Sequence, residues 1–303
     1  MNQQMEQRAV SSCTMTRLGG GRGGEALLIA GSERTALYDG GMAYAAAQTA
    51  AACRSALEGR ALDYILLSHT HYDHIGALPV LLRAFPGATV LGAAHAREVL
   101  ARPHALRSIE ERGRDAARLF GGDPDQVTTA GMRVDRVIGD GDVIDLGGCR
   151  LRVLAAPGHT ACSLAFAVEP QHFLISSESV GVIGPGGRQM TAILKSYDGA
   201  MDTLRRFRGC RPERLYCPHS GWLDRGRAAA FLDGFEKLAR EQKELIETAV
   251  RQGKGEAEIL AAYQSRYWDE AWHDVQPLFA FRINALCMIR LFAGAPQRRQ
   301  AGR

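Results

Sequence analysis

The sequence has no C-x-x-C pair, and its seven cysteines are scattered along the chain. An odd number of dispersed cysteines argues against a disulfide framework and indicates reduced, mostly buried thiols. No stretch approaches the ~20 consecutive apolar residues of a membrane-spanning helix. The N-terminal stretch MNQQMEQRAVSSC is polar and lacks the apolar core of a secretory signal. We therefore expect a cytoplasmic protein without a membrane partner.

Basic residues show no clustering that would indicate a nucleic-acid surface. The net charge is +4, and part of the excess lies in the C-terminal RRQAGR. A nucleic-acid binder gathers Lys and Arg on one face or helix, whereas the arginines here are dispersed, so we expect no nucleic-acid partner. The segment LGGGRGG (residues 18–24) lacks the G-K-[ST] of a phosphate-binding loop and is interpreted as a flexible turn before the first strand.

The pattern of apolar residues predicts two αβ halves followed by a helical tail. A chain of 303 residues with 46% hydrophobic and 23% charged residues is compatible with one large α/β domain that carries extra helices. In the first half, short apolar runs alternate with helical patterns. These predict strands at residues 25–31, 34–41, 62–68 and 88–93, and helices at 43–57, 76–85 and 94–120.

The second half is richer in strand patterns. They predict strands at residues 132–138, 149–156, 163–169, 172–176 and 214–218, a Gly-rich loop at 181–189 and a helix at 198–207. From residue 225 the pattern is helical, with predicted helices at 229–250, 255–266 and 278–293. The aromatic residues of this tail are interpreted as packing residues, with a lid over a substrate as the alternative for some of them: Tyr263, Tyr267, Trp268, Trp272 and Phe279.

The segment LLSHTHYDHIGALP contains the densest group of potential metal ligands. His69, His71, Asp73 and His74 fall within six residues, directly after a predicted buried strand. Histidines at positions i and i+2 of an extended or turning segment can converge on one metal, and imidazole together with carboxylate suits Zn²⁺, Fe or Mn²⁺. Chance is a poor explanation for three of the nine histidines in one such window. The segment therefore predicts a metal site at the end of this strand.

The sequence here resembles the metallo-β-lactamase-fold hydrolases, whose signature H-x-H-x-D-H is matched by HTHYDH. Later segments match further motifs of that family in order. His159 lies in the Pro-Gly-His-Thr context of AAPGHTACS, Glu178 lies in LISSES at the position of a family Asp, and His219 lies in LYCPHSGW at a strand end. The agreement in motif order extends over residues 25–222, which is most of the chain.

The resemblance implies an α/β fold, the four-layer αββα sandwich of the metallo-β-lactamase fold, with a C-terminal helical extension. The implied ligands of the first metal are His69, His71 and His159, and those of the second metal are Asp73, His74 and His219. Glu178 would bridge the two metals together with a water or hydroxide. We expect two divalent cations, with zinc favoured and iron or manganese as alternatives. Asp73 would also be catalytic, because it can orient the nucleophile or accept its proton.

Glu178 departs from the usual Asp by one methylene, which adds about 1.5 Å of reach. Three outcomes are open: a bridge between two metals, a ligand to one metal only, or no ligation. The apolar run FLIS before it argues against an ordinary surface loop. The remaining histidines have no ligand-like neighbours and are interpreted as surface or capping residues: His95, His104, His172 and His273.

The resemblance also implies a division of the chain and a reaction. We expect a flexible N-terminal segment (1–24), a catalytic domain (25–224) and a C-terminal helical cap or lid (225–303). The layout is most similar to PqsE-type quinolone-pathway thioesterases, which implies hydrolysis of an acyl thioester of coenzyme A or a carrier by a hydroxide bound to two metals.

Three alternatives to the thioesterase remain open. The first is another hydrolase of this fold, acting on a lactone, a glutathione thioester or a phosphodiester. The second is a di-iron oxidoreductase. The third is a catalytically weakened regulatory protein. The expected partner is a small acyl substrate, and a homodimer or a regulatory protein partner stays open.

Overall fold

The structure, a computed structural model, describes residues 7–10 and 13–294. The chain divides into two compact units. The first comprises the residues up to Ala155 together with Leu164–His172, and the second comprises Ala156–Ser163 together with the residues from Phe173 onward. Within the described part of the chain, no helix combines the length and the apolar character that a membrane span requires.

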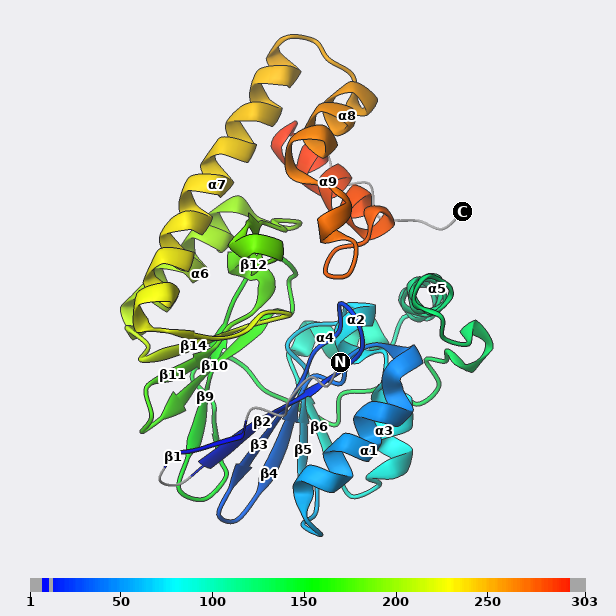
Figure 1. Cartoon of the computed structure of the whole chain (residues 1–303), viewed down its shortest axis with the longest axis vertical. Coiled ribbons are helices and arrows are strands. Elements are labelled where there is room, and N and C mark those ends of the chain that lie inside the picture. Colours follow the sequence, from blue (N-terminus) through cyan, green and yellow to red (C-terminus); the bar gives the residue numbers. More distant parts are fainter. Residues whose placement is uncertain (1–6, 11–12, 295–303) are drawn as a thin grey trace. The chain divides into compact units, whose positions relative to one another are not determined.

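A mixed sheet runs through the first unit, with seven strands among the described residues in the order β1 to β7 (Figure 1). Strands β1 to β4 pair antiparallel, and β4 to β7 pair parallel. The strands are β1 (Gln7–Val10), β2 (Cys13–Gly19), β3 (Ala26–Gly31), β4 (Thr35–Tyr38), β5 (Tyr64–Leu66), β6 (Thr89–Gly92) and β7 (Arg136–Val137). Strand β4 is buried along its whole length, as expected for a parallel strand covered on both faces.

The parallel pairing of β4 with β5 places two chain ends side by side. Tyr38 pairs with Leu66 at the carboxyl ends of these strands. The next residues along each strand, Asp39 on one and Ser68 and His69 on the other, therefore emerge at the same edge of the sheet. Ligand sites of α/β proteins commonly form at such carboxyl ends.

The helices of the first unit follow the predicted pattern except for one division and for the short α2, which lies in a segment predicted as a loop. They are α1 (Ala46–Leu57), α2 (Tyr72–Ile75), α3 (Leu78–Ala84), α4 (Ala94–Leu100) and α5 (Pro103–Phe120). The helical segment predicted over 94–120 is two helices, because Pro103 cannot donate a hydrogen bond to the preceding turn and instead occupies the first turn of α5.

A second mixed sheet has six strands among the described residues, in the order β15-β14-β11-β10-β9-β8. Its strands are β8 (Val143–Asp145), β9 (Arg150–Ala155), β10 (Leu164–Glu169), β11 (Phe173–Ile175), β14 (Arg214–Cys217) and β15 (Gly221–Asp224). A separate ribbon is formed by β12 (Val182–Ile183) and β13 (Gln189–Met190), which pair antiparallel.

Several short strands were not predicted. The ribbon β12–β13 lies in the segment interpreted as a Gly-rich loop, where two-residue strands leave no periodicity to detect. Residues 13–19 form β2, so the prediction of a flexible segment ahead of the first strand is wrong for them. Residues 20–25, which include the last five of LGGGRGG, form the turn between β2 and β3, and the Tyr44 hydroxyl accepts a hydrogen bond from Arg22 N at 2.6 Å.

The C-terminal helices belong to the second unit, in which α8 and α9 pack beside the long α7 (Figure 1). They follow α6 (Tyr197–Cys210) and are α7 (Arg225–Arg251), α8 (Glu256–Tyr267) and α9 (Leu278–Phe292). Tyr263, Trp272 and Phe281 belong to one buried apolar cluster, which confirms the packing role for Tyr263 and Trp272. The predicted division at residue 225 stays a prediction.

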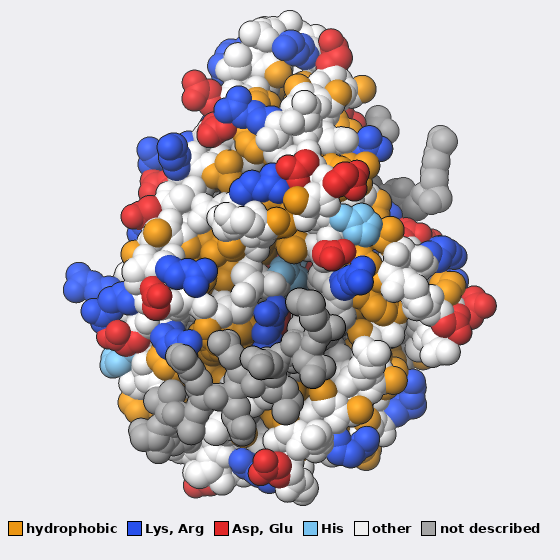
Figure 2. Space-filling view, in the orientation of Figure 1, with side chains coloured by type: hydrophobic (Ala, Val, Ile, Leu, Met, Phe, Trp, Pro, Cys, Tyr) orange, Lys and Arg blue, Asp and Glu red, His pale blue; other side chains and the backbone are white. Residues whose placement is uncertain are grey.

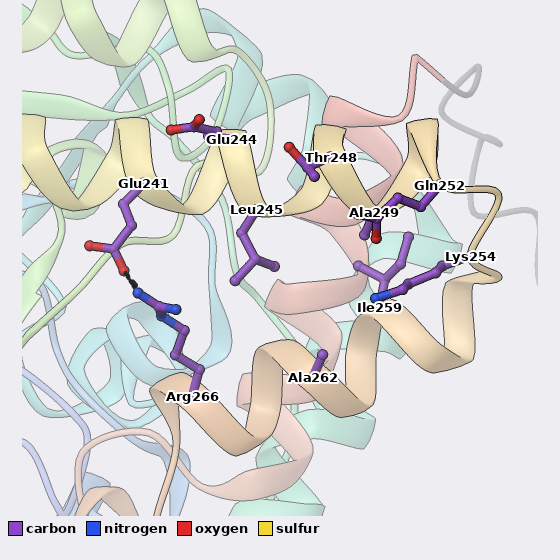
Figure 3. Close-up of a pocket in the computed structure, with 10 residues that line it drawn as sticks. All are labelled: Glu241, Glu244, Leu245, Thr248, Ala249, Gln252, Lys254, Ile259, Ala262 and Arg266. Carbon is purple, nitrogen blue, oxygen red and sulfur yellow. Dashed lines mark hydrogen bonds and ion pairs between the residues drawn. The ribbon is translucent and has the colours of Figure 1, made fainter.

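A pocket of about 430 Å³ lies between α7 and α8 (Figure 3). Leu245, Ala249 and Ile259 line its apolar part, and Glu241 accepts a hydrogen bond from Arg266 at 2.6 Å at one end. The pocket contains none of the predicted metal ligands. It is therefore a feature of the helices alone.

Surface charge and cysteines agree with the sequence. On the face shown in Figure 2, Lys and Arg side chains are interspersed with Asp and Glu. All seven cysteines are free thiols, five of them buried and Cys210 and Cys287 partly buried. The prediction of mostly buried thiols is confirmed.

Gly31 provides a stability test of how the turn before β9 packs against β3. A Cβ at this position would lie 2.1 Å from Leu146 O and 2.6 Å from Gly147 O. The turn cannot retreat easily, because Ser32 N donates to Gly147 O at 2.8 Å. We expect Gly31→Ala to lower the free energy of unfolding by about 1–3 kcal/mol, measured by urea denaturation. Gly87→Ala is the control, since a Cβ there meets nothing within 4 Å; equal stability of the two variants would contradict the packing described.

Candidate metal centre

The segment His69–His74 leaves β5 and turns into the short helix α2. His71 precedes the first residue of α2 in an extended conformation, and Asp73 and His74 lie within the helix. His69 and His74 are almost completely buried, with exposed fractions of 1% and 0%, whereas Asp73 retains a side-chain exposure of 19%. The turn from strand to helix thus gathers the ligands that the HTHYDH pattern predicted.

Asp39 is a fully buried carboxylate that holds this segment in place through hydrogen bonds. Its Oδ1 accepts a hydrogen bond from Ser68 N at 2.8 Å, and its Oδ2 accepts one from Ser68 Oγ at 2.7 Å. The same Oδ2 lies 2.7 Å from Nδ1 of His74. The following Gly40 and Gly41 donate their N–H groups to His74 O at 2.7 and 2.9 Å. Ring and backbone of His74 are therefore both held by the Asp39–Gly41 turn.

These contacts determine which imidazole nitrogen faces the other ligands. A carboxylate only accepts hydrogen bonds, so His74 carries its proton on Nδ1. Ser68 Oγ donates its proton to Asp39 and lies 2.9 Å from Nδ1 of His69. It must therefore accept from His69, which also carries its proton on Nδ1. Both rings present a lone pair at Nε2, the arrangement typical of metal-ligating histidines.

His159 reaches the same state through a backbone carbonyl. Its Nδ1 lies 2.7 Å from Ala192 O, an acceptor only, so the proton again lies on Nδ1. The loop before it is tightly held: Lys195 N donates to Gly158 O at 2.9 Å, and Thr203 Oγ1 donates to Pro157 O at 2.7 Å. Gly158 has φ +134° and lies against α6, where a Cβ would be 2.7 Å from Cα of Ala200. The Pro-Gly-His motif therefore permits a close approach that another residue would prevent.

Glu178 lies between two of the histidines. It is the first residue of η3 (Glu178–Val180), a 3₁₀ helix of one turn, and its side chain is 8% exposed. Its Oε2 lies 3.2 Å from Nε2 of His159, and its Oε1 lies 2.7 Å from Nε2 of His219. Each carboxylate oxygen thus faces a histidine from a different predicted metal. This arrangement is compatible with a bridge, which stays a prediction.

His219 lies in the tight turn between β14 and β15 with φ +65°. This left-handed conformation is uncommon for residues other than Gly and costs of the order of 1–3 kcal/mol. Asp39 has a similar φ of +54°. Ser220 fixes the turn by donating its hydroxyl to Ile183 O at 2.6 Å. Strained backbone at both positions is typical of functional sites.

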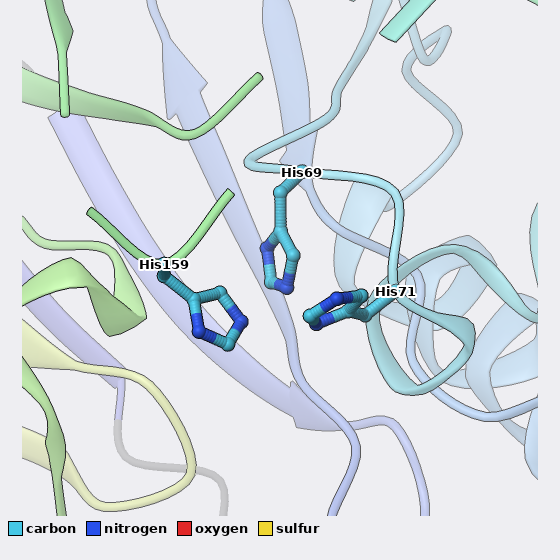
Figure 4. Close-up of side chains that lie close together, drawn as sticks. All are labelled: His69, His71 and His159. Atoms are coloured by element: carbon cyan, nitrogen blue, oxygen red, sulfur yellow. The ribbon is translucent and has the colours of Figure 1, made fainter. Parts of the chain in front are cut away.

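The predicted ligands form two groups in the part of the chain that the structure describes. The ligand atoms within each group lie within 4.8 Å of one another. The groups are His69, His71 and His159, and Asp73, His74, Glu178 and His219. Figure 4 shows the three imidazoles of the first group turned toward one another. Glu178, predicted to bridge the two metals, falls in the second group. The assignment of these residues as metal ligands stays a prediction.

The donor set fits two divalent cations. Imidazole nitrogens with carboxylate oxygens suit Zn²⁺, Fe²⁺ and Mn²⁺, and the Nδ1 partners described above make Nε2 the nitrogen through which three of the histidines would bind a cation. The four remaining histidines belong to neither group within the described residues. His95 instead lies 3.1 Å from Glu98, and His273 lies 3.2 Å from Asp274.

Asp39, Ser68 and Ala192 were not identified from the sequence. Asp39 carries a usable signal, because an acidic residue followed by two glycines ends the buried strand TALY. Ser68 directly precedes the first ligand and could have been considered with it. Ala192 acts through its carbonyl, which gives no signal in residue type.

A family model described as the metallo-beta-lactamase superfamily matches residues 19–219, more than half of the chain. In structure, the chain is similar to ST1585 from Sulfolobus tokodaii, with a TM-score of 0.58 and 23% identity over 72% of this chain and 84% of that chain. The metallo-β-lactamase fold with two mixed sheets and C-terminal helices, predicted from the sequence, is confirmed.

Curated relatives are similar over part of their length. The metallo-beta-lactamase fold-containing protein ST1585 of Sulfurisphaera tokodaii is 30% identical over 53% of this chain and 61% of that protein. A hydroxyacylglutathione hydrolase of Bradyrhizobium sp. is 26% identical over 58% of this chain and 55% of the relative. An atrochrysone carboxyl ACP thioesterase of Aspergillus fumigatus is 26% identical over 61% of this chain and 47% of the relative. In each case less than two thirds of the relative is spanned.

Asp39→Asn tests the orientation of His74. The side chain keeps its size and tolerates the left-handed backbone, but its amide nitrogen would donate toward Nδ1 and move the proton of His74 to Nε2. We expect zinc affinity to fall by about 10–100-fold, measured by competition with a chromophoric chelator. Asp63→Asn is the control, because Asp63 also accepts backbone and hydroxyl hydrogen bonds, from Thr35. An unchanged affinity in Asp39→Asn would show that the proton position does not matter.

Glu178→Gln tests the carboxylate between His159 and His219. The amide keeps the length of the side chain but removes the negative charge and one acceptor oxygen. We expect metal affinity to fall at least about tenfold, which corresponds to ~1.4 kcal/mol, and metal content per chain to drop on elemental analysis. Glu169→Gln is the control, because Glu169 at the end of β10 forms a partly exposed ion pair with Arg152. Unchanged metal content in Glu178→Gln would place this residue outside the metal site.

Proposed function

Because the chain belongs to the metallo-beta-lactamase superfamily, we propose that it acts within it as an acyl-thioesterase dependent on two divalent cations, zinc being favoured. The observation that carries the proposal is the presence of two groups of histidine and carboxylate side chains whose ligand atoms lie within 4.8 Å of one another in each group. The finer resemblance to PqsE-type thioesterases, predicted from the sequence, is part of the same proposal.

The names of two relatives support thioester chemistry. One is a hydroxyacylglutathione hydrolase, whose named substrate is a thioester of glutathione, and the other is an ACP thioesterase. The two substrates share a thioester carbonyl and differ in the thiol that leaves. A coenzyme A or carrier-protein thioester of a small acyl group is the substrate class that we propose.

The chemistry that two divalent cations supply in such a site is activation of water and polarisation of a carbonyl oxygen. The side chains of the chain would supply position and proton transfer. His69, His74 and His159 would keep a fixed ring orientation, because each Nδ1 has a hydrogen-bond acceptor. The histidines would thus hold the cations in a constant geometry while the substrate is bound and released.

Asp73 is the carboxylate best placed to act on a proton. Its Oδ2 lies 3.6 Å from Nε2 of His74, and its side chain is 19% exposed, compared with 8% for Glu178. A group that exchanges protons with water needs this access, whereas a carboxylate enclosed between two histidines does not have it. We assign to Asp73 the orientation of the water and acceptance of its proton.

Hydrolysis of acyl-coenzyme A substrates tests the proposal. We expect release of free thiol, followed with a thiol-reactive dye, at a higher kcat/KM than hydrolysis of a lactone or a phosphodiester of similar size. His71→Ala should lower kcat/KM at least about 100-fold, which corresponds to ~2.7 kcal/mol of transition-state stabilisation. Removal of metal with a chelator should abolish turnover, and addition of zinc should restore it.

His95→Ala is the matched control, because His95 is a partly exposed histidine whose partner is Glu98. It should leave kcat/KM unchanged. Faster turnover of the lactone, the glutathione thioester or the phosphodiester would assign the chain to another hydrolase of this superfamily. Turnover that survives in His71→Ala would contradict the metal-dependent reaction.

A further inference from the structure

The Ala192 carbonyl, which orients His159, lies in the segment that begins at Glu178, another predicted ligand. Ala192 O lies 2.7 Å from Nδ1 of His159. Along the chain, the β12–β13 ribbon connects Glu178 to Ala192. A shift of this ribbon would therefore move the Glu178 carboxylate and the acceptor of the His159 ring together.

The C-terminal helices hold the ribbon at Thr191, the residue before Ala192. Thr191 Oγ1 donates a hydrogen bond to Gln242 Oε1 of α7 and lies 3.9 Å from Sδ of Met288 on α9. The Tyr263 hydroxyl of α8 lies 3.6 Å from the same sulfur. These side chains are buried, with exposed fractions of 1% for Gln242 and 3% for Thr191. Thr191 thus contacts α7 and α9, and Tyr263 of α8 contacts the same Met288 sulfur.

Other contacts fix the rest of the ribbon to the same helical region. Gln189 Nε2 donates to Phe231 O of α7 at 3.0 Å. Arg188 donates to both carboxylate oxygens of Asp269 at 2.6 and 2.9 Å. The ribbon therefore has polar contacts with the helices on both sides of β13.

A buried glutamine in an apolar cluster has a cost that packing alone does not explain. An amide that loses its contact with water must be hydrogen-bonded inside the protein, and an apolar side chain of similar size would fill the same space without that requirement. A hydrogen bond, unlike apolar packing, selects one position of its partner. The Thr191–Gln242 hydrogen bond therefore fixes the position of the backbone that follows β13 and carries the Ala192 carbonyl.

We propose that Thr191 and Gln242 are positioning residues for His159, through which the C-terminal helices set the geometry of the first group of metal ligands. The helices act on the imidazole through one backbone carbonyl, that of Ala192. This role of Thr191 and Gln242 toward His159 does not depend on the proposed reaction, since it holds for any substrate.

Thr191→Val, compared with Thr191→Ser in the full chain, tests the proposal. Valine keeps the shape of the side chain and removes the hydroxyl, whereas serine keeps the hydroxyl. In the zinc-loaded protein, we expect Thr191→Val to weaken zinc binding by about tenfold and Thr191→Ser to restore the affinity of the unaltered chain. In the metal-free protein, exchange of the His159 Nδ1 proton, followed by ¹⁵N NMR of labelled histidine, should accelerate about tenfold in Thr191→Val and not in Thr191→Ser.

Ile246→Val on α7 is the matched control for a loss of packing. Ile246 is fully buried in the same helix, so this variant should lower stability without changing zinc affinity or proton exchange at His159. Gln242→Leu tests the same hydrogen bond from α7 and should reproduce both effects of Thr191→Val, also where that variant folds poorly. Two results would overturn the proposal. One is an equal change of zinc affinity and of His159 proton exchange in Ile246→Val and Thr191→Val. The other is no change of these two quantities in Thr191→Val and Gln242→Leu. Zinc affinity and His159 proton exchange are both measured without a substrate. They therefore test the positioning role even if the chain is not a thioesterase.

Discussion

A neutral imidazole can bind a metal through Nε2 only while its proton is held at Nδ1, and the site depends on this constraint. Three acceptors of different kinds meet it. A carboxylate faces His74, a hydroxyl already committed as a donor faces His69, and a backbone carbonyl faces His159. Because Asp39 receives the Ser68 hydroxyl and the His74 ring together, one buried charge sets the protonation of two ligands in different groups.

The first sheet makes two of these acceptors possible by bringing two strand ends together. Asp39 follows β4, and Ser68 follows β5, and the parallel pairing of these strands aligns their carboxyl ends. Both Asp39 and His219 adopt left-handed backbone conformations, which cost free energy where they occur. Asp39 is held by hydrogen bonds to Ser68 and to the ring of His74. At His219, the next residue, Ser220, anchors the turn to Ile183 O. At these two positions, the left-handed backbone therefore carries a side chain that serves the site.

Prediction from sequence succeeds where the chemistry is local and fails where it is tertiary. The HTHYDH segment carries four ligands within six residues, so their type and spacing alone predict a metal site. Asp39 is 35 positions from His74, and only the pairing of β4 with β5 gives it a role. Strands as short as β12 and β13, with two residues each, are too short to show a periodicity of their own.

The extra methylene of Glu178 matters because the position of its backbone is fixed by the turn that carries it. A shorter acid would need its backbone closer to the histidines, whereas Glu178 begins a 3₁₀ turn that Ser179 fixes by donating to Ala156 O at 2.5 Å. Ser179 Oγ also accepts a hydrogen bond from His159 N at 3.4 Å. The backbones of Glu178 and His159 are therefore tied to each other, so the longer side chain and the turn that carries it form one unit. Since the ribbon continues from this turn to Ala192, the helices that hold the ribbon constrain the carboxylate as well as the ring.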